Sequence, residues 1–208
     1  FHPGIGAAQF GVGQNILVGA NTQGLAIGDM NDDGRDDVVT ASVESEGVGV
    51  TTGNGDGFNP TVFSGLGTGI LDVALGDFNE DDVPDIVATD RQQERAFVLI
   101  NQGDGRFNNP ITINLGAAIA VTRAKVAVGD FNNDTHLDFV VNNAASNRIA
   151  VVLGNGNGVF ANPLYYGSPE VNYSVEVGDI DRDGDLDLFV PASSSNTLNI
   201  HLNSCISP

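Results

Sequence analysis

Short runs of β-branched and apolar residues alternate with Gly, Asn and Asp along the chain, and no segment keeps a helical period. The runs come in groups of four. In each group an acidic loop follows the first run, a polar connection separates the second run from the third, and a Gly-rich turn precedes the fourth. Short β-branched runs bounded by turn-forming residues are typical of strands. The pattern therefore predicts an all-β fold built from four antiparallel units.

The groups repeat with a period of about fifty residues. The first aspartate of the acidic loop recurs at positions 29, 77, 130 and 179. Four antiparallel strands in each unit of this length match the blade of a β-propeller. The sequence predicts a single propeller domain over residues 1–208, with four blades over residues 24–66, 72–116, 125–168 and 174–203.

The last group has only three apolar runs, whereas residues 14–19 (QNILVG) form a strand-like run ahead of the first group. We expect this N-terminal strand to close the last blade, because joining the ends of a ring removes exposed strand edges. The simplest result is a closed four-bladed ring. An eight-bladed propeller formed by two chains that exchange strands is one alternative, and a fragment of a longer propeller is another.

All four acidic loops follow the spacing D-x-[DN]-x-D-x-x-x-D. Calcium takes about six to eight oxygen ligands, and a tight loop can aim side chains at positions one, three, five and nine, and a backbone carbonyl at position seven, toward one centre. The absence of thiolate and imidazole ligands argues against zinc and copper, and magnesium demands stricter geometry. The sequence predicts up to four calcium ions, with Arg35, Val83, His136 and Asp185 giving carbonyls. The full set of predicted ligands is Asp29, Asn31, Asp33, Arg35, Asp37, Asp77, Asn79, Asp81, Val83, Asp85, Asp130, Asn132, Asp134, His136, Asp138, Asp179, Asp181, Asp183, Asp185 and Asp187.

The four loops differ at position six. Gly34 and Gly184 occupy it in the outer loops, whereas Asp82 and Thr135 occupy it in the middle ones. A left-handed backbone is free for glycine and strained for a β-branched residue. We therefore expect the loop that contains Thr135 to bind calcium most weakly.

The motif "GDFNxDxxxD" followed by an apolar strand resembles the FG-GAP or VCBS repeat, which occurs in integrin α-subunit propellers and in many secreted proteins. The resemblance covers nearly the whole chain. It implies that the acidic loop joins the first, inner strand of a blade to the second and binds calcium. The family's glycine at loop position six is missing in two of the four copies.

Composition agrees with metal-binding loops. The chain has 27 acidic and 8 basic residues, for a formal charge of −19, and 13 of the acids are predicted side-chain ligands. Four calcium ions would leave a net charge of −11, which still disfavours binding to nucleic acid.

No stretch is long and apolar enough to cross a membrane. A lone Cys205 rules out an internal disulfide but leaves a link to another chain open. Open calcium loops suit a calcium-rich environment, so we expect an extracellular or cell-surface protein.

Antiparallel topology places the second-to-third and fourth-to-first connections on the face opposite the acidic loops. Polar residues there could bind a glycan or a protein with acidic groups, although solvated loop tips without a ligand would look the same. The absence of Trp weakens a lectin interpretation. The candidate ligand-binding residues are Arg91, Gln92, Arg95, Asn143, Asn147, Arg148, Tyr173 and Asn196.

The sequence favours a non-enzymatic recognition or scaffold module that binds calcium, with a protein or glycan partner and a homodimer as an option. A carbohydrate-binding lectin is the first alternative. A polysaccharide lyase or hydrolase is the second, and its only candidate groups are Tyr173 with Arg123 or Lys125. None of the three histidines stands at recognisable spacing from a nucleophile.

Overall fold

The computed structural model describes residues 13–116, 124–143, 147–168, 174–192 and 195–205, and it places fifteen β-strands and no helix among them. No helix suited to crossing a membrane therefore occurs in this part of the chain. The strands are β1 (Thr22–Gly28), β2 (Asp37–Ser42), β3 (Val48–Thr51), β4 (Val62–Phe63), β5 (Ile70–Gly76), β6 (Asp85–Asp90), β7 (Arg95–Leu99), β8 (Ile111–Asn114), β9 (Val126–Gly129), β10 (Asp138–Asn143), β11 (Arg148–Val152), β12 (Leu164–Gly167), β13 (Glu176–Gly178), β14 (Asp187–Ala192) and β15 (Thr197–His201).

The strands form four antiparallel sheets in sequence order, which we call blades 1 to 4. Blades 1, 2 and 3 have four strands each (β1–β4, β5–β8 and β9–β12), and blade 4 has three (β13–β15). The register of the first two strands is the same in every blade, because the glycine before the acidic loop always pairs with the aspartate at loop position nine. The all-β propeller architecture predicted from the sequence is confirmed.

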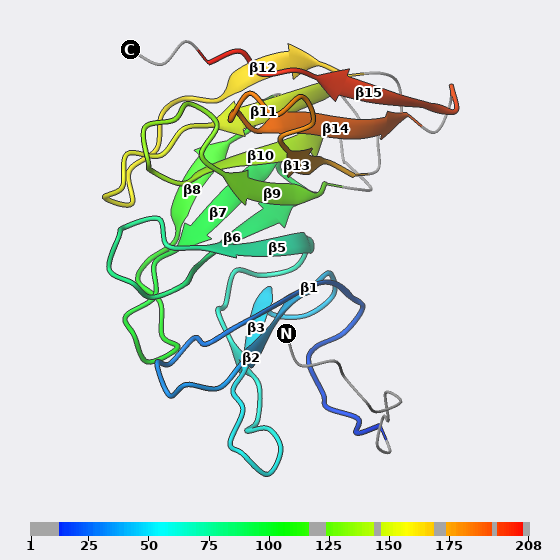
Figure 1. Ribbon diagram of the computed structural model, residues 1–208. Helices are drawn as coiled ribbons and strands as arrows, with labels where there is room; N and C mark the ends of the chain where they lie inside the picture. Colours follow the sequence, from blue (N-terminus) through cyan, green and yellow to red (C-terminus); the bar gives the residue numbers. More distant parts are fainter. Residues whose placement is uncertain (1–12, 117–123, 144–146, 169–173, 193–194, 206–208) are drawn as a thin grey trace, which may run out of the picture.

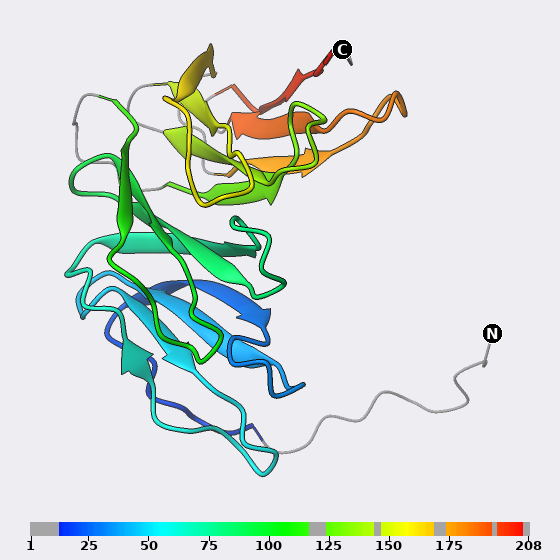
Figure 2. The same ribbon diagram turned by 90° about the vertical axis from the view of Figure 1, so that its left-hand side faces the viewer.

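The blades stack face to face, and the hydrophobic core lies between them. Three clusters of buried apolar side chains fill the boundaries between blades 1 and 2, blades 2 and 3, and blades 3 and 4. Period-two alternation explains this, since each inner strand directs one set of side chains toward the preceding blade and the other toward the following blade. Figures 1 and 2 show the result as a stack with blade 1 at one end and blade 4 at the other.

Two glycines show how closely the blades approach. A Cβ atom at Gly76 would lie 3.0 Å from a methyl group of Leu137, and one at Gly129 would lie 2.5 Å from a methyl group of Leu186. Both leucines belong to the next blade. Glycine before the acidic loops of blades 2 and 3 is therefore required by packing between blades.

Hydrogen bonds also connect successive blades at the acidic loops. The side-chain amide of Asn101 in blade 2 donates to the carbonyl of Met30 in blade 1 at 2.8 Å, and Asn203 in blade 4 donates to the carbonyl of Phe131 in blade 3 at 2.8 Å. Between blades 2 and 3 the backbone N–H of Gly158 makes the equivalent bond to Phe78 at 2.9 Å. In each case the acceptor is the carbonyl at position two of the loop.

The predicted closure of blade 4 by residues 14–19 is wrong for the described structure, in which blade 4 has three strands and the sheets do not close into a ring. Residues 14–19 are not part of any sheet, and this segment lies instead against blade 1. The Thr40 hydroxyl donates to the carbonyl of Val18 at 3.1 Å, and the Thr61 hydroxyl donates to that of Leu17 at 2.8 Å. An apolar alternation identifies a strand but does not specify which sheet edge it meets.

Candidate calcium-binding loops

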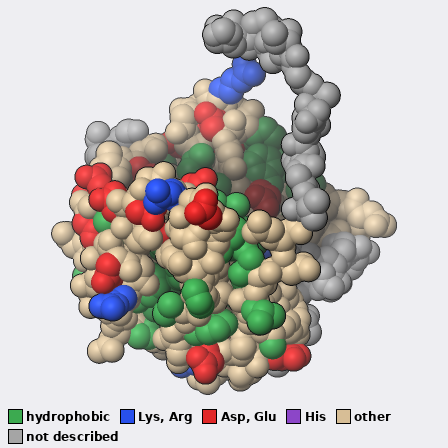
Figure 3. Space-filling view, turned by 90° about the horizontal axis from the view of Figure 1, so that it is seen from below, with side chains coloured by type: hydrophobic (Ala, Val, Ile, Leu, Met, Phe, Trp, Pro, Cys, Tyr) green, Lys and Arg blue, Asp and Glu red, His purple; other side chains and the backbone are tan. Residues whose placement is uncertain are grey.

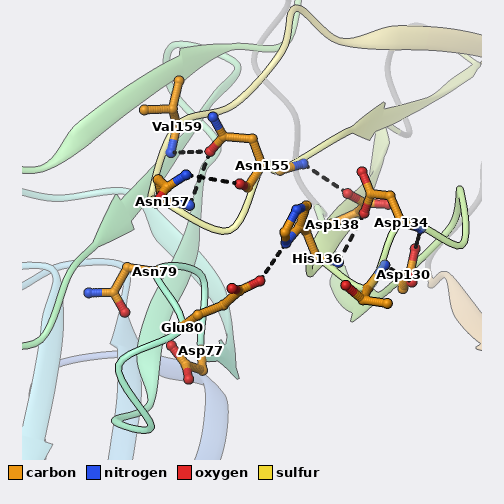
Figure 4. Close-up of polar contacts among 12 residues, drawn as sticks. Asp77, Asn79, Glu80, Asp130, Asp134, His136, Asp138, Asn155, Asn157 and Val159 are labelled. Atoms are coloured by element: carbon orange, nitrogen blue, oxygen red, sulfur yellow. Dashed lines mark hydrogen bonds and ion pairs between the residues drawn. The ribbon is translucent and has the colours of Figure 1, made fainter.

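The acidic loops connect the first strand to the second in all four blades, as predicted. All twenty predicted ligand residues lie within the described residues. The four loops adopt one conformation with small variations, so the third of them can be followed in Figure 4 as an example of the set.

The aspartate at position one organises each loop by accepting hydrogen bonds from the loop backbone. One carboxylate oxygen accepts the N–H at position six, at 2.7 Å in the first loop and 2.8 Å in the second and third. The other accepts the N–H at position five in these three loops. Although desolvation acts in the opposite direction, the N–H groups of Gly34 and Asp33 lower the pKa of Asp29, which keeps this side chain an anion.

Two positions of every loop have a left-handed backbone. Position six has φ of +77° at Gly34, +66° at Asp82, +75° at Thr135 and +97° at Gly184. Position four also lies in this region, although it is occupied by Asp, Glu, Asn or Arg. The expectation that Thr135 adopts a positive φ is confirmed. The left-handed backbone at position four was not predicted, because no loop has a glycine there that would have indicated it.

We expect the substitution Thr135→Gly to stabilise the protein by about 1 kcal/mol, because a β-branched residue at positive φ is strained and glycine is not. The matched reverse change is Gly34→Thr in the first loop, where an added Cβ would meet no atom within 4 Å, so only backbone strain opposes it. Thermal unfolding with calcium and with chelator measures both. A destabilised Thr135→Gly, or a Gly34→Thr variant as stable as the parent, would contradict the strain argument.

The aspartate at position nine is fully buried in every blade and hydrogen-bonds two separate segments. In blade 2, Asp85 accepts the N–H of Phe78 at 2.9 Å and that of Asn101 at 2.8 Å. Asp138 does the same in blade 3 with Phe131 and Gly154. Burial is the main reason that the pKa values of Asp85 and Asp138 rise to about 6. The carboxylate at position nine therefore fastens the acidic loop to the end of the third strand.

The role of the position-nine aspartate in fastening the loop to the third strand was not predicted, although a repeated spacing in the sequence indicates it. The second N–H donor lies sixteen residues after the aspartate in all four blades, at Gly53, Asn101, Gly154 and Asn203. A constant offset in all four repeats would have marked these positions. Their identity matters as well, since Asn101 and Asn203 are also the residues that bond to the preceding blade.

The fourth loop gathers carboxylates most closely. One oxygen each from Asp179, Asp181 and Asp187 lie within 4.8 Å of one another, which no other trio of acidic, His or Cys residues in the described part of the chain achieves. Desolvation and then the negative charge of Asp183 raise the pKa of Asp181. Repulsion of this kind is relieved when a cation binds, and oxygen donors are the ligands that calcium prefers.

In the first three loops a side chain of the same loop engages the position-five carboxylate. Arg35 forms an ion pair with Asp33 at 3.3 Å, the amide of Asn79 donates to Asp81 at 2.8 Å, and the amide of Asn132 donates to Asp134 at 2.9 Å. These contacts are exposed or partly exposed and contribute little individually. A bound cation would replace them with stronger interactions, so the donor set fits calcium in all four loops.

Two neighbouring loops touch through a side-chain pair. Figure 4 shows Glu80, at position four of the second loop, pointing toward the ring of His136, at position seven of the third. The hydrogen bond to Glu80 raises the pKa of His136. The acidic loops of blades 2 and 3 are thus connected side by side on one face of the protein.

The candidate ligand-binding residues on the opposite face are partly occupied by contacts within their own blades. Arg95 pairs with Asp90 at 3.0 Å and lies over the Phe97 ring, and Arg148 lies over the Tyr165 ring. The remaining candidates are in or beside the connections between second and third strands: Arg91, Gln92, whose side-chain amide reaches Thr68, Asn143 at the end of β10, Asn147 and Asn196.

The groups considered for catalysis do not form a described constellation. Tyr173, which was also a candidate for ligand binding, lies outside the described residues, as does Arg123. Lys125 pairs with the buried Asp72 at 2.6 Å, so its ammonium group stabilises packing between blades 2 and 3. Cys205 is a free thiol that donates to the carbonyl of Asn132 at 3.1 Å.

Several solved structures share the fold. A lectin from Agrocybe aegerita, described as recognising non-reducing terminal N-acetylglucosamine, matches with a TM-score of 0.59 and 19% identity over 89% of this chain and 50% of its own. A BBS1N structure in complex with ARL6DN gives a TM-score of 0.58 at 14% identity, covering 90% of this chain and 59% of that one. The Tc holotoxin pore of Photorhabdus luminescens gives 0.52 at 20% identity, covering 90% and 9%. The chain thus spans about half the length of the lectin.

Sequence comparison gives the family. No curated protein matches the chain significantly. The sequence model of the FG-GAP-like repeat, by contrast, matches three overlapping segments, residues 29–88, 81–141 and 130–190. Each segment runs from one acidic loop into the next blade. The repeated loop, the four-stranded blades and this match together show that the chain belongs to the FG-GAP-like repeat family.

Proposed function

We propose that the protein is a calcium-binding recognition or scaffold module that works outside the cell and has no enzymatic activity. The observation that supports calcium binding most directly is the fourth loop, where one carboxylate oxygen each from Asp179, Asp181 and Asp187 lie within 4.8 Å of one another. The repetition of the same loop geometry in blades 1 to 3 extends the proposal to four ions.

Calcium would be held by side chains at positions one, three, five and nine and by the carbonyl at position seven. Bound calcium supplies the positive charge that neutralises these clustered carboxylates. The chain's own residues do the rest: the position-one aspartate orders the loop backbone, and the buried position-nine aspartate ties the loop to the third strand. Since the loops of blades 1, 2 and 3 also contact the following blade, order in these loops would hold the blades in place.

Native mass spectrometry with and without a chelator tests the proposal. We expect up to four calcium ions for each 21.6 kDa chain, all lost on chelation and not replaced by an equal concentration of magnesium. The third loop should empty first as calcium is lowered, because of Thr135. A spectrum that shows no calcium adducts beyond those of the Asp181→Asn/Asp183→Asn variant would rule out a site in the fourth loop.

The recognition surface is assigned to the face opposite the acidic loops. Its exposed amides and partly free guanidinium groups suit a protein ligand with acidic groups. A glycan is the alternative ligand, favoured by the shared fold with a lectin. A glycan array that includes terminal N-acetylglucosamine separates the two, since reproducible calcium-dependent binding would favour the lectin. An array without hits from the folded, calcium-loaded protein would favour a protein ligand.

A lyase or hydrolase remains the less supported possibility. Its candidate base or acid would need a free Lys125, but that ammonium group is paired with Asp72. Arg123 and Tyr173 lie outside the described residues, so none of the three candidate groups offers an unpaired charge in the described part of the chain. The Lys125–Asp72 contact therefore supports a non-enzymatic role.

A further inference from the structure

Blades 2, 3 and 4 each cover one apolar side chain, which stands at position two of the acidic loop in the preceding blade. Met30, Phe78 and Phe131 are 0%, 1% and 8% exposed because blades 2, 3 and 4 lie over them. The equivalent residue of blade 4 is Ile180, which is 50% exposed. A Cβ atom at Gly178 would likewise meet only Phe189 of its own sheet, whereas Gly76 and Gly129 face a leucine of the next blade. The outer face of blade 4 thus has the features of a blade contact without its partner.

At the other end of the stack, apolar side chains of blade 1 lack a preceding blade to cover them. Val73, Val126 and Val175, four residues before the loop aspartate, are 5%, 8% and 2% exposed beneath the preceding blade. Leu25 holds this position in blade 1 and is 62% exposed, and Ile27 on the same face is 60% exposed. Seen from the blade 1 end, the protein shows hydrophobic side chains grouped among polar ones (Figure 3). Both end faces are therefore halves of the contact that occurs three times inside the chain.

A cavity of about 460 Å³ adjoins blade 4, between β11 and β12 of blade 3 and β14 and β15 of blade 4. Its walls are largely apolar, and β15 has no partner strand on its outer edge among the described residues. The buried Nε2 of His201, also in the wall, has no hydrogen-bond partner within the described part of the chain. The main lining side chains are Phe131, Leu153, Leu164, Tyr166, Leu188 and His201.

The contact between blades 2 and 3 shows which kind of side chain fills such a space. Between blades 2 and 3, the ring of Phe160 packs edge-on against Phe78 and Phe139, with ring centroids 5.5 Å apart in both pairs. Phe160 belongs to the Gly-rich turn that leads into the fourth strand of its blade. Phe131 and Leu188 hold the positions of Phe78 and Phe139 one blade further on, and both line the cavity. The cavity is thus shaped for an aromatic side chain followed by a fourth strand.

The chain carries a second segment of this kind. Phe58 and Phe160 precede the next loop aspartate by 19 residues (58 and 77, 160 and 179), and Phe10 precedes Asp29 by the same number. Residues 14–19 then correspond to the fourth strand. In the single chain the described part of this segment lies at the blade 1 end, held by hydroxyl contacts to the carbonyls of Leu17 and Val18, and the side chain of Leu17 is 93% exposed.

We propose that this segment completes blade 4 of a second copy of the chain. Phe10 of one copy fills the cavity of the other, residues 14–19 pair with the open edge of β15, and blade 1 of the donor covers Ile180 of the acceptor. Two copies related by a two-fold axis each donate and accept one segment, so all four end faces are buried and eight blades form one ring. Exchange of a segment between identical chains is a low-cost route to a dimer, and the described contacts given up here are hydroxyl hydrogen bonds to the carbonyls of Leu17 and Val18.

Light scattering of the full chain, with calcium and about 0.15 M salt to screen its acidic charge, tests the proposal. We expect a dimer. Because each dimer contains two exchanged segments, Phe10→Ala should weaken dimerisation about ten-thousandfold, about a hundredfold for each aromatic side chain removed from an apolar cavity. Phe1→Ala, which removes another N-terminal phenylalanine outside this spacing, is the matched control and should have no effect.

A second variant separates loss of binding from misfolding. Leu164→Asp places a charge at the rim of the cavity, on a side chain that is 46% exposed and so tolerates substitution in the fold. It should also be monomeric. A mixed pair of Leu164→Asp and Phe10→Ala chains keeps one of its two exchanged contacts intact, so the mixture should dimerise more strongly than either variant alone. A full chain that stays monomeric up to about 100 μM, roughly the range in which weak contacts form, or a mixture that does not associate, would overturn the proposal.

Discussion

Removing calcium should lower the midpoint of thermal unfolding by about 5 to 10 °C for each site that was saturated. An ion present at about a hundred times its dissociation constant stabilises the folded state by about 2.7 kcal/mol. For a domain of this size, 1 kcal/mol corresponds to a shift of about 2–4 °C. The effect is large here because 13 of the 27 acidic residues are predicted side-chain ligands, and these carboxylates repel one another when no cation is bound.

Calorimetry with calcium and with excess chelator measures this shift. The double substitution Asp181→Asn/Asp183→Asn should remove about a quarter of the calcium-dependent gain, because it disables one loop of four. Asp104→Asn removes an exposed carboxylate outside the loops whose described contacts are with Arg106, and it should leave the gain intact. If the chelated protein melts at the same temperature as the calcium-loaded one, calcium has no structural role.

The substitution Asp85→Ala should destabilise the protein by about 3–5 kcal/mol even in chelator. The side chain of Asp85 is fully buried, and its two oxygens accept the N–H groups of Phe78 and Asn101. Alanine leaves two buried donors without an acceptor, and each unsatisfied donor costs about 1–3 kcal/mol. Loss of the contact also frees Asn101, which connects blade 2 to Met30 of blade 1.

Urea unfolding in chelator isolates this effect from metal binding. The control is Asp82→Gly, three residues earlier, which removes the same charge from an exposed position with φ of +66° and should be neutral or slightly stabilising. Equal stabilities for Asp85→Ala and Asp82→Gly would show that position nine serves only as a metal ligand and does not fasten the strands.

The sequence predicted the repeated parts of the structure well. Four blades, the connection of each acidic loop between first and second strands, and the positive φ at Thr135 all follow from local patterns. Such features depend on residues close in the chain, where alternation, turn formers and ligand spacing are directly readable.

The sequence did not predict what depends on contacts between segments far apart in the chain. Residues 14–19 look like a strand, but the structure places them against blade 1, and the described part of blade 4 has three strands. Candidate binding residues on the opposite face were identified by their polarity, yet Arg95 is engaged by Asp90 and Phe97, which polarity does not reveal.

The acidic loops have some properties that depend on the local sequence and others that depend on the tertiary structure. By itself the sequence determined their spacing, their oxygen ligands and their charge, because these are properties of nine consecutive residues. Only the tertiary structure decided that the aspartate at position nine is buried and bonded to a backbone N–H sixteen residues away, and that the following blade bonds to the carbonyl at position two. Burial and long-range hydrogen bonds are set when sheets stack, so the same aspartates that suit calcium also hold the blades together.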